Sequence, residues 1–149
     1  MTTRSAAYSK IGRHNSRTYR SGLEEKNIEY LRTLRINPRY EEVYLEYTIP
    51  ESVHKYTPDF VLPNGIIIET KGVWDVEDRK KHILIREQHP ELDIRFVFSR
   101  SKTPIYKGSK TTYASFCEKN GIKFADKIIP EAWISEKESH NNLCLKPKK

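Results

Sequence analysis

Three side chains near the middle of the sequence have the types and the spacing of a metal-dependent hydrolytic site. Asp59 follows a proline, and after a short spacer comes the segment Glu69-Thr70-Lys71. Two carboxylates can hold a divalent cation, which neutralises charge on a phosphate and makes a bound water nucleophilic. A lysine beside them can orient or deprotonate that water. The pattern therefore indicates metal-dependent hydrolysis of a phosphodiester, with Asp59, Glu69 and Lys71 as the catalytic residues.

The types of these ligands favour a hard cation. Mg2+ binds carboxylate and carbonyl oxygens and keeps several of its waters in an octahedral arrangement. Mn2+ accepts the same kind of oxygen ligands. We expect Asp59 and Glu69 to bind Mg2+ or Mn2+, with the backbone carbonyl of Thr70, water and a DNA phosphate completing the octahedron.

The three side chains meet only if the segment forms a hairpin in the right register. Side chains two apart on a strand share a face, so Glu69 and Lys71 project together. A two-residue loop would pair Asp59 with Thr70, whereas the three-residue loop 63–65 pairs it with Glu69. We predict the second register, because the proline of this loop presets φ for the turn and its glycine accepts a left-handed position.

The competing interpretation of this motif is structural. Glu69 and Lys71 would form a charge pair on a solvated strand, and Asp59 would be a turn residue. The apolar runs 60–62 and 66–68 argue against it, because they indicate largely buried strands in which unpaired charges are costly. We therefore favour the catalytic interpretation.

Hydrophobic periodicity around the motif predicts a mixed α/β fold. Ser21-Gly22-Leu23-Glu24 has the form of a capping box and begins a helix over residues 22–36. Period-two alternation predicts a strand over residues 40–49. The other expected elements are hairpin strands over 57–62 and 66–71, a helix capped by Asp75 and ended by Pro90, a strand over 93–99, a loop over 101–110, a helix over 112–120 and an irregular remainder. This order predicts a central mixed sheet flanked by helices.

The charge of the chain points to a polyanionic partner. The formal net charge is +7 and the pI is about 9.4, an excess that favours nucleic acid. Lysines 146, 148 and 149 make the C-terminal end basic, and residues 1–20 contain no acidic residue. The alternative is that both ends are solubilising tails. The basic residues of the N-terminal arm that we expect to contact DNA phosphates are Arg4, Lys10, Arg13, Arg17 and Arg20.

The composition also argues against membrane-spanning, secreted, zinc-cluster and disulfide-rich proteins. The sequence has no long uncharged apolar run, so neither a membrane span nor a secretory leader is predicted, and we expect an intracellular protein. Cys117 and Cys144 are far apart and form no CxxC pattern, and the five histidines are scattered without metal-ligand spacing. The sequence therefore predicts neither a zinc cluster nor a disulfide framework.

Several segments taken together resemble one family of phage enzymes. The segments are Tyr19-Arg20-Ser21-Gly22-Leu23-Glu24, Tyr56-Thr57-Pro58-Asp59-Phe60, Pro63-Asn64-Gly65-Ile66, Glu69-Thr70-Lys71-Gly72 and Asp78-Arg79-Lys80-Lys81-His82. They resemble phage endonuclease I, the Holliday-junction resolvases of T-odd coliphages and their relatives, within the PD-(D/E)xK nuclease superfamily. The likeness extends over roughly residues 19–134.

This resemblance implies a restriction-endonuclease-like fold and a homodimer whose subunits exchange residues 19–49. The domain organisation would be a basic arm over 1–18, a nuclease domain over 19–135 and a basic tail over 136–149. The capping-box pattern by itself gives Glu24 a structural role, in which its side chain accepts a hydrogen bond from the Ser21 amide. The resemblance reverses that preference and makes Glu24 a catalytic residue and second-site metal ligand in the other subunit. The helix residues expected to grip DNA phosphates are Arg79, Lys80 and Lys81.

The function implied by the resemblance is structure-selective cleavage of DNA. A symmetric dimer has two equivalent active sites and can cut two strands of a four-way junction in the cytoplasm of an infected host cell. One alternative is a sequence- or mismatch-specific restriction-type nuclease, because the same catalytic spacing serves many DNA substrates. Another is a DNA-binding module without catalysis, which the charge and the tyrosines near basic residues would also support.

Overall fold

The computed structural model describes residues 21–49, 51–138, 142 and 144–148. Five strands form its central sheet, namely β1 (Arg39–Tyr40), β4 (Phe60–Val61), β5 (Ile67–Lys71), β6 (Ile94–Phe98) and β7 (Phe124–Asp126). Their order is β1-β4-β5-β6-β7. β4 is antiparallel to β1 and β5, whereas β5, β6 and β7 are parallel to one another, so the expected mixed sheet is confirmed.

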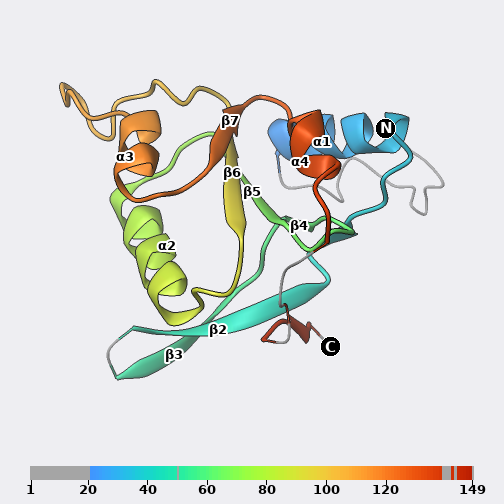
Figure 1. Cartoon of the computed structure of the whole chain (residues 1–149). Coiled ribbons are helices and arrows are strands. Elements are labelled where there is room, and N and C mark those ends of the chain that lie inside the picture. The colour runs from blue at the N-terminus through green and yellow to red at the C-terminus, as the bar shows by residue number, and fades with distance from the viewer. Residues whose placement is uncertain (1–20, 50, 139–141, 143, 149) are drawn as a thin grey trace.

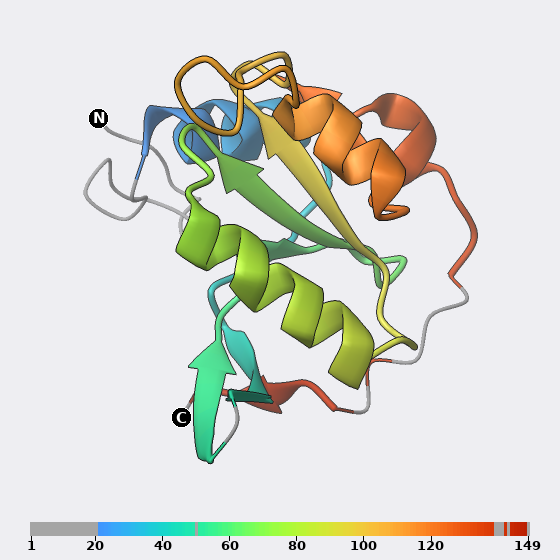
Figure 2. The same ribbon diagram turned by 90° about the vertical axis from the view of Figure 1, so that its left-hand side faces the viewer.

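Helices cover both faces of this sheet (Figure 1). α2 (Val76–Gln88) and α3 (Tyr113–Lys119) lie on one face, and α1 (Gly22–Thr33) and α4 (Glu131–Ile134) lie on the other. Figure 2 shows α2 and α3 in front of the sheet and α1 behind it. Within the described ranges, no helix combines the length and the apolar character needed to cross a bilayer.

Successive residues of the central strands face opposite hydrophobic clusters. Ile67, Phe96 and Phe98 belong to the cluster that packs against α2 and α3, whereas Ile68 and Val97 belong to the cluster that packs against α1 and α4. Both faces of these strands are therefore buried. This explains why the sequence shows continuous apolar runs here instead of alternation.

The helix starts agree with the sequence better than the helix ends do. Ser21 and Asp75 each accept a hydrogen bond from a backbone amide in the first turn of their helix, as their residue types favour. The helix expected over residues 22–36 ends at Thr33 instead. Arg35 has a φ of 59°, so the chain has already left the helical conformation before residue 36.

The strand expected over residues 40–49 is interrupted. Glu41 has a φ of 52°, and the chain leaves the central sheet there and continues as β2 (Val43–Ile49). β3 (Ser52–Tyr56), which the sequence did not predict, pairs antiparallel with β2. β8 (Lys146–Pro147) pairs with the other edge of β2. These three strands form a second sheet, which extends below α2 in Figure 1.

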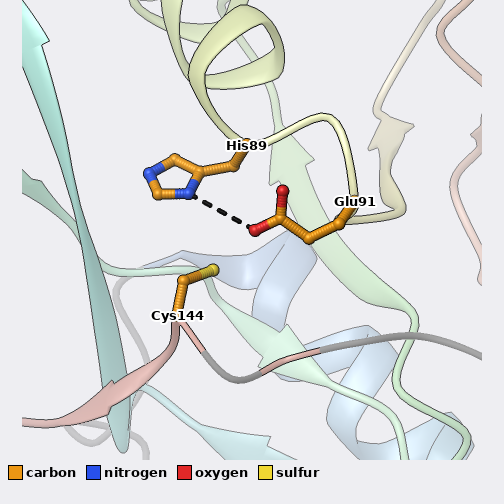
Figure 3. Close-up of side chains that lie close together, drawn as sticks. All are labelled: His89, Glu91 and Cys144. Carbon is orange, nitrogen blue, oxygen red and sulfur yellow. Dashed lines mark ion pairs between the residues drawn. The ribbon is translucent and has the colours of Figure 1, made fainter.

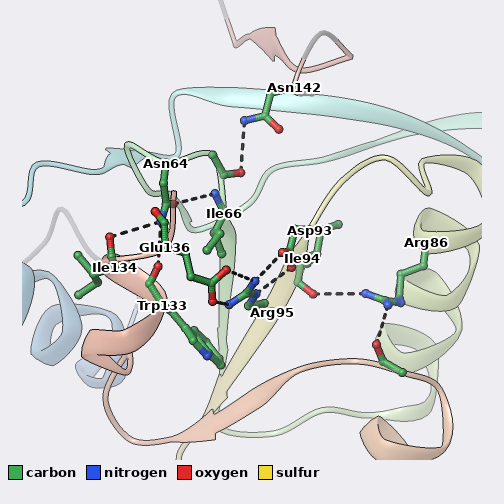
Figure 4. A network of polar contacts seen from close by, with 12 residues as sticks. Asn64, Ile66, Arg86, Asp93, Ile94, Arg95, Trp133, Ile134, Glu136 and Asn142 are labelled. Atoms are coloured by element: carbon green, nitrogen blue, oxygen red, sulfur yellow. Dashed lines mark hydrogen bonds and ion pairs between the residues drawn. The ribbon is translucent and has the colours of Figure 1, made fainter. Parts of the chain in front are cut away.

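The chain after Gly121 is more ordered than the expected irregular remainder, because it contains β7 and α4. Arg95 in β6 is 1% exposed, and its guanidinium binds the carboxylates of both Asp93 and Glu136 (Figure 4). The side-chain amide of Asn64, in the hairpin loop, donates to the backbone carbonyls of Trp133 in α4 and of Glu136. The polar network therefore ties Glu136 to the sheet and to the hairpin loop.

Candidate active site

The hairpin that carries the motif has the predicted register. Gly65 has a φ of 94°, which closes the loop 63–65 in the region that glycine favours. One step beyond the last ladder pair, the same register sets Asp59 opposite Glu69, so the three-residue loop is confirmed. The pairs that define it are Phe60 with Ile68, Val61 with Ile67 and, through a 2.8 Å backbone hydrogen bond, Leu62 with Ile66.

Side chains continue the hairpin beyond its backbone ladder. Asp59 is 1% exposed, and its Oδ2 accepts hydrogen bonds from the backbone amide and the hydroxyl of Thr70, at 2.9 and 2.8 Å. The amide of Asp59 donates to Oε1 of Glu69 at 3.4 Å. Asp59 thus contacts two residues of the opposite strand: its amide binds Glu69, and its carboxylate binds Thr70.

Glu69 is a buried carboxylate close to a second negative charge, that of Asp59. The hydroxyl of Tyr56 donates to its Oε1 at 2.7 Å, and the ammonium of Lys71 lies 3.7 Å from its Oε2. Burial, followed by the negative charge of Asp59, raises the pKa of Glu69 to about 8, although Lys71 and Tyr56 both act to lower it. Without a further positive charge, the fold therefore favours a proton on this group near neutral pH.

Lys71 is held between two carboxylates. Its Nζ lies 2.9 Å from Oδ2 of Asp78 on α2. The side chains of Lys71 and Glu69 lie on the same face of the strand, as predicted. Burial would lower the pKa of Lys71, but the charges of Glu69 and Asp78 outweigh it, and the pKa is raised. We call Glu69, Lys71 and Asp78 the lysine cluster. Sequence reasoning did not predict the contact between Asp78 and Lys71, because the helix register that brings Asp78 to the sheet depends on tertiary packing.

A second group of carboxylates meets Asp59 from the side of α1. Ligand oxygens of Glu24, Glu41 and Asp59 all lie within 4.8 Å of one another, and we call these residues the acidic cluster. Glu24 is 4% exposed, its amide donates to Oγ of Ser21, and its Oε1 accepts from the hydroxyl of Tyr40 at 2.6 Å. Its backbone therefore takes part in the cap while its carboxylate faces the site.

Glu41 belongs to this site although sequence reasoning missed it. Its left-handed φ interrupts the strand at the point where the chain passes the hairpin, and the Glu41 amide donates to the carbonyl of Asp59 at 3.2 Å. A non-glycine residue in this conformation is uncommon, and such residues gather at functional sites. The side-chain pattern carries no signal of it, because alternation assumes an uninterrupted strand.

The expected DNA-contacting residues of α2 differ in their placement. Arg79 is 7% exposed and donates to the carbonyls of Trp74 and Ile105, so burial removes its guanidinium from the surface and gives it a structural role. Lys80 is exposed. Lys81 is half-buried and lies 3.6 Å from Asp78. The arm residues Arg4, Lys10, Arg13, Arg17 and Arg20 lie outside the described residues.

The donors at this site suit a hard divalent cation. Asp59 belongs to the acidic cluster, and its amide donates to Glu69 of the lysine cluster. The buried carboxylates of Asp59, Glu24 and Glu69 offer oxygen ligands of the kind that Mg2+ and Mn2+ prefer. Positive charge placed near Asp59 would also relieve the repulsion that raises the pKa of Glu69. The residues therefore fit a divalent-metal site.

Comparisons with known proteins agree with this geometry. The family model for phage endonuclease I matches residues 5–149. The chain is 60% identical over 131 residues to Endonuclease I of Escherichia phage T7, covering 88% of each protein. It is 62% identical over 120 residues to Endodeoxyribonuclease 1 of Enterobacteria phage T3, covering 80% of this chain and 79% of that protein. The chain belongs to the phage endonuclease I family.

Proposed function

We propose that the protein is a divalent-metal-dependent endodeoxyribonuclease that resolves four-way junctions and other branched DNA. The observation that carries the proposal is the set of buried carboxylates around Asp59, with Lys71 fixed beside them, in a chain of an endonuclease family. The names of the two phage relatives support cleavage of DNA. Because both come from phages, we place the substrate in the cytoplasm of the infected host.

In this proposal, Asp59 and Glu69 bind Mg2+ or Mn2+, together with the backbone carbonyl of Thr70. The bound ion would neutralise charge on the scissile phosphate and lower the pKa of a water. Lys71 carries a raised pKa and so stays protonated, which suits donation to the attacking water or to a phosphate oxygen more than removal of a proton. Asp78 positions Lys71 for that contact. Glu24, with Glu41, would supply ligands for a second ion on the other side of Asp59.

The proposed enzyme is a homodimer whose subunits exchange residues 19–49. An exchange of identical elements preserves their contacts and changes only which chain supplies them. Glu24 of the partner subunit would then take the place that Glu24 has beside Asp59 in the single chain. Two composite sites related by symmetry suit paired cuts in the two strands of a junction.

Basic side chains would hold the junction by its phosphates. Residues 1–18 form the proposed arm, residues 19–135 the nuclease domain and residues 136–149 the basic tail. Each phosphate contact that is lost should flatten the log-log salt dependence of binding by about 0.9. The proposed contact residues are Arg4, Lys10, Arg13, Arg17, Arg20, Lys80 and Lys81.

A cleavage assay separates the candidate functions. The full chain is given a four-way junction and a linear duplex of the same sequence, with Mg2+ or with chelator. We expect fast cutting of the junction with Mg2+ and little cutting of the duplex. Equal cutting of the duplex at defined sequences or mismatches would favour a restriction-type nuclease, and junction binding without any cutting would favour a DNA-binding module.

Mixed dimers test the exchange of residues 19–49. A chain carrying Glu24→Ala is co-expressed with a differently tagged chain carrying Glu69→Ala, and the heterodimer is isolated. If the segment is exchanged, one site of the heterodimer receives an intact Glu24 and an intact Glu69, so one strand of the junction is nicked. Without exchange, every site carries one substitution, and the heterodimer stays as inactive as either homodimer.

A further inference from the structure

A second mixed group of metal-binding side chains lies at the other end of α2. Figure 3 shows His89 at the end of this helix, Glu91 just beyond it and Cys144 from the C-terminal segment. One ligand atom from each lies within 4.8 Å of the other two. Asp78 and His89 are separated by about 16 Å along a helix that rises roughly 1.5 Å per residue. The group is therefore separate from the hydrolytic centre.

The imidazole of His89 is oriented as in a metal ligand. Its Nε2 lies against the backbone carbonyl of Glu46 in β2, and because a carbonyl only accepts, Nε2 carries the proton and donates. The other nitrogen, Nδ1, points toward Glu91, with 3.6 Å between Nδ1 and Oε2 (Figure 3). A carbonyl that fixes the tautomer and leaves the second nitrogen for an ion is a common outer-shell arrangement at metal sites.

The separation of these atoms matches the size of a tetrahedral site. Nitrogen, oxygen and sulfur ligands of Zn2+ lie about 2.0–2.3 Å from the ion, which places two ligands roughly 3.3–3.6 Å apart. The 3.6 Å between His89 and Glu91 already agrees with this value. A surface hollow lined in part by Thr48, Gln88 and Cys144 leads to the group and offers room for a water as a further ligand.

We propose that His89, Glu91 and Cys144 form a Zn2+ site, in which Nδ1, a carboxylate oxygen and the thiolate bind the ion and water takes the fourth position. A soft thiolate together with an imidazole selects Zn2+ over Mg2+. Burial and the neighbouring Glu91 raise the pKa of the Cys144 thiol to about 11, so the metal-free thiol keeps its proton. Binding of Zn2+ releases that one proton to the solvent and forms the bond to sulfur.

This site would fasten the C-terminal segment to the rest of the fold. Cys144 lies two residues before the start of β8, which pairs with β2 at Val43 and Tyr44. His89 and Glu91 come from the end of α2 and the turn after it. One ion would therefore join the second sheet, α2 and the C-terminal segment. Sequence reasoning did not predict this group, because Cys144 is far from His89 and Glu91 along the chain.

The test uses the metal-free full chain in reducing buffer, without DNA. Titration with Co2+ as a spectroscopic probe for Zn2+ should produce a thiolate charge-transfer band that saturates at one equivalent per chain. Zn2+, but not Mg2+, should displace the band and slow alkylation of Cys144. Cys117 is fully buried and serves as the internal control for alkylation, since its reactivity should not respond to metal.

Substitutions test whether the ion binds to His89, Glu91 and Cys144. Cys144→Ser should remove the band, and His89→Gln should weaken Zn2+ binding by about 100-fold or more, as loss of a ligand exceeds loss of an outer-shell partner. His54→Ala removes an exposed histidine of β3 and should leave binding unchanged. Asp59→Asn should also leave the band unchanged. The proposal is overturned if no charge-transfer band forms, or if Zn2+ binding survives Cys144→Ser but is lost in Asp59→Asn. If Cys144→Ser does not fold, Glu91→Gln with the same titration decides.

Discussion

The lysine cluster and the acidic cluster are built differently. The lysine cluster alternates charges, because Lys71 lies between Glu69 and Asp78, and Lys81 adds a further cation beside Asp78. The acidic cluster brings carboxylates together within 4.8 Å of one another. The first arrangement fixes the position of one ammonium group, and the second attracts a cation from solution. Asp59 of the acidic cluster and Glu69 of the lysine cluster lie opposite each other across the hairpin, so the two proposed metal ligands come one from each cluster.

The largest effect is expected at Asp59, where the acidic cluster contacts Glu69 of the lysine cluster. Asp59→Asn keeps an oxygen that can accept from Thr70 but removes the negative charge of the carboxylate. Cleavage of a junction should fall by about 1,000-fold or more, because several kcal/mol of transition-state stabilisation by the metal are lost. The junction Kd, measured by gel shift, should stay within about 3-fold, since phosphate contacts supply most of the affinity.

Asp126→Asn is the matched control for this variant. Asp126 also accepts hydrogen bonds from a backbone amide and a hydroxyl, both of Ser101, but it lies on β7 outside both clusters. Its cleavage rate should equal that of the unmodified protein. A similar loss of activity in both variants would show that Asp59 acts through the stability of the fold.

A smaller loss is expected from the positioning side of the site. Asp78→Asn removes the charge that holds Lys71 at 2.9 Å, and a misplaced catalytic group can cost about 100-fold in rate. The single-turnover rate should therefore fall by about 10- to 100-fold, while the Mg2+ concentration for half-maximal cleavage changes little. Glu77→Gln, an exposed neighbour on α2, serves as control. A shift in Mg2+ dependence as large as the loss of rate would show that Asp78 acts through metal binding instead.

The pH dependence of metal binding tests the proposed role of Glu69 as a ligand. Because the pKa of Glu69 is about 8, a proton competes with the cation below this pH, and Mg2+ affinity should rise as the pH increases from 6 through 8. Tyr56→Phe removes a hydrogen bond that lowers this pKa, so the rise should move to higher pH, with roughly 10-fold weaker affinity at pH 7. Calorimetry in two buffers of different ionisation enthalpy measures the released proton. Affinity that does not vary with pH would contradict the role given to Glu69.

The same shift sets the pH dependence of stability in the metal-free protein. Glu69 has a pKa of about 8 in the folded protein and an ordinary pKa of 4.5 when exposed to water, so the folded state binds more protons between these pH values. Stability should therefore fall as the pH rises through this window. Glu69→Gln should reduce that fall, as thermal melts at several pH values in chelator would show.

The smallest effect concerns the loop that sets the register for both clusters. Asn64→Ala removes the amide that binds carbonyls of Trp133 and Glu136, at 2.8 and 3.0 Å. Unfolding free energy in urea should drop by about 1–2 kcal/mol, because two partly buried hydrogen bonds are lost. Asn120→Ala, at an exposed side chain, should cost less. A loss of junction cleavage that exceeds the loss of stability would show that the loop shapes the site as well.

Local chemistry made part of this molecule predictable. The Pro-Asn-Gly loop specified the hairpin register, and side-chain caps marked the starts of two helices. The continuous apolar runs indicated buried strands flanked by helices. Each of these signals is contained within a few neighbouring residues, which is why the sequence alone predicted that Asp59, Glu69 and Lys71 lie close together.

Features that depend on distant partners were not predictable. Most residues of β3 are exposed, so it shows no alternation and depends on pairing with β2. Arg79 lies in a basic run that reads as a solvated surface, but the helical period places it on one buried face with His82 and Ile85. Glu41 joins the site through a left-handed backbone conformation that its residue type does not reveal.

Single-turnover cleavage of a four-way junction across a range of Mg2+ concentrations tests the central claim most directly. The comparison is between the unmodified chain and Glu69→Gln, with the junction fully bound in both cases. We predict that the unmodified chain cuts in proportion to bound Mg2+ and stops in chelator, and that Glu69→Gln binds the junction but cuts about 1,000-fold more slowly or not at all. Cutting in chelator, or an unchanged rate and Mg2+ dependence in Glu69→Gln, would contradict the claim that buried carboxylates beside Lys71 bind the metal that hydrolyses DNA.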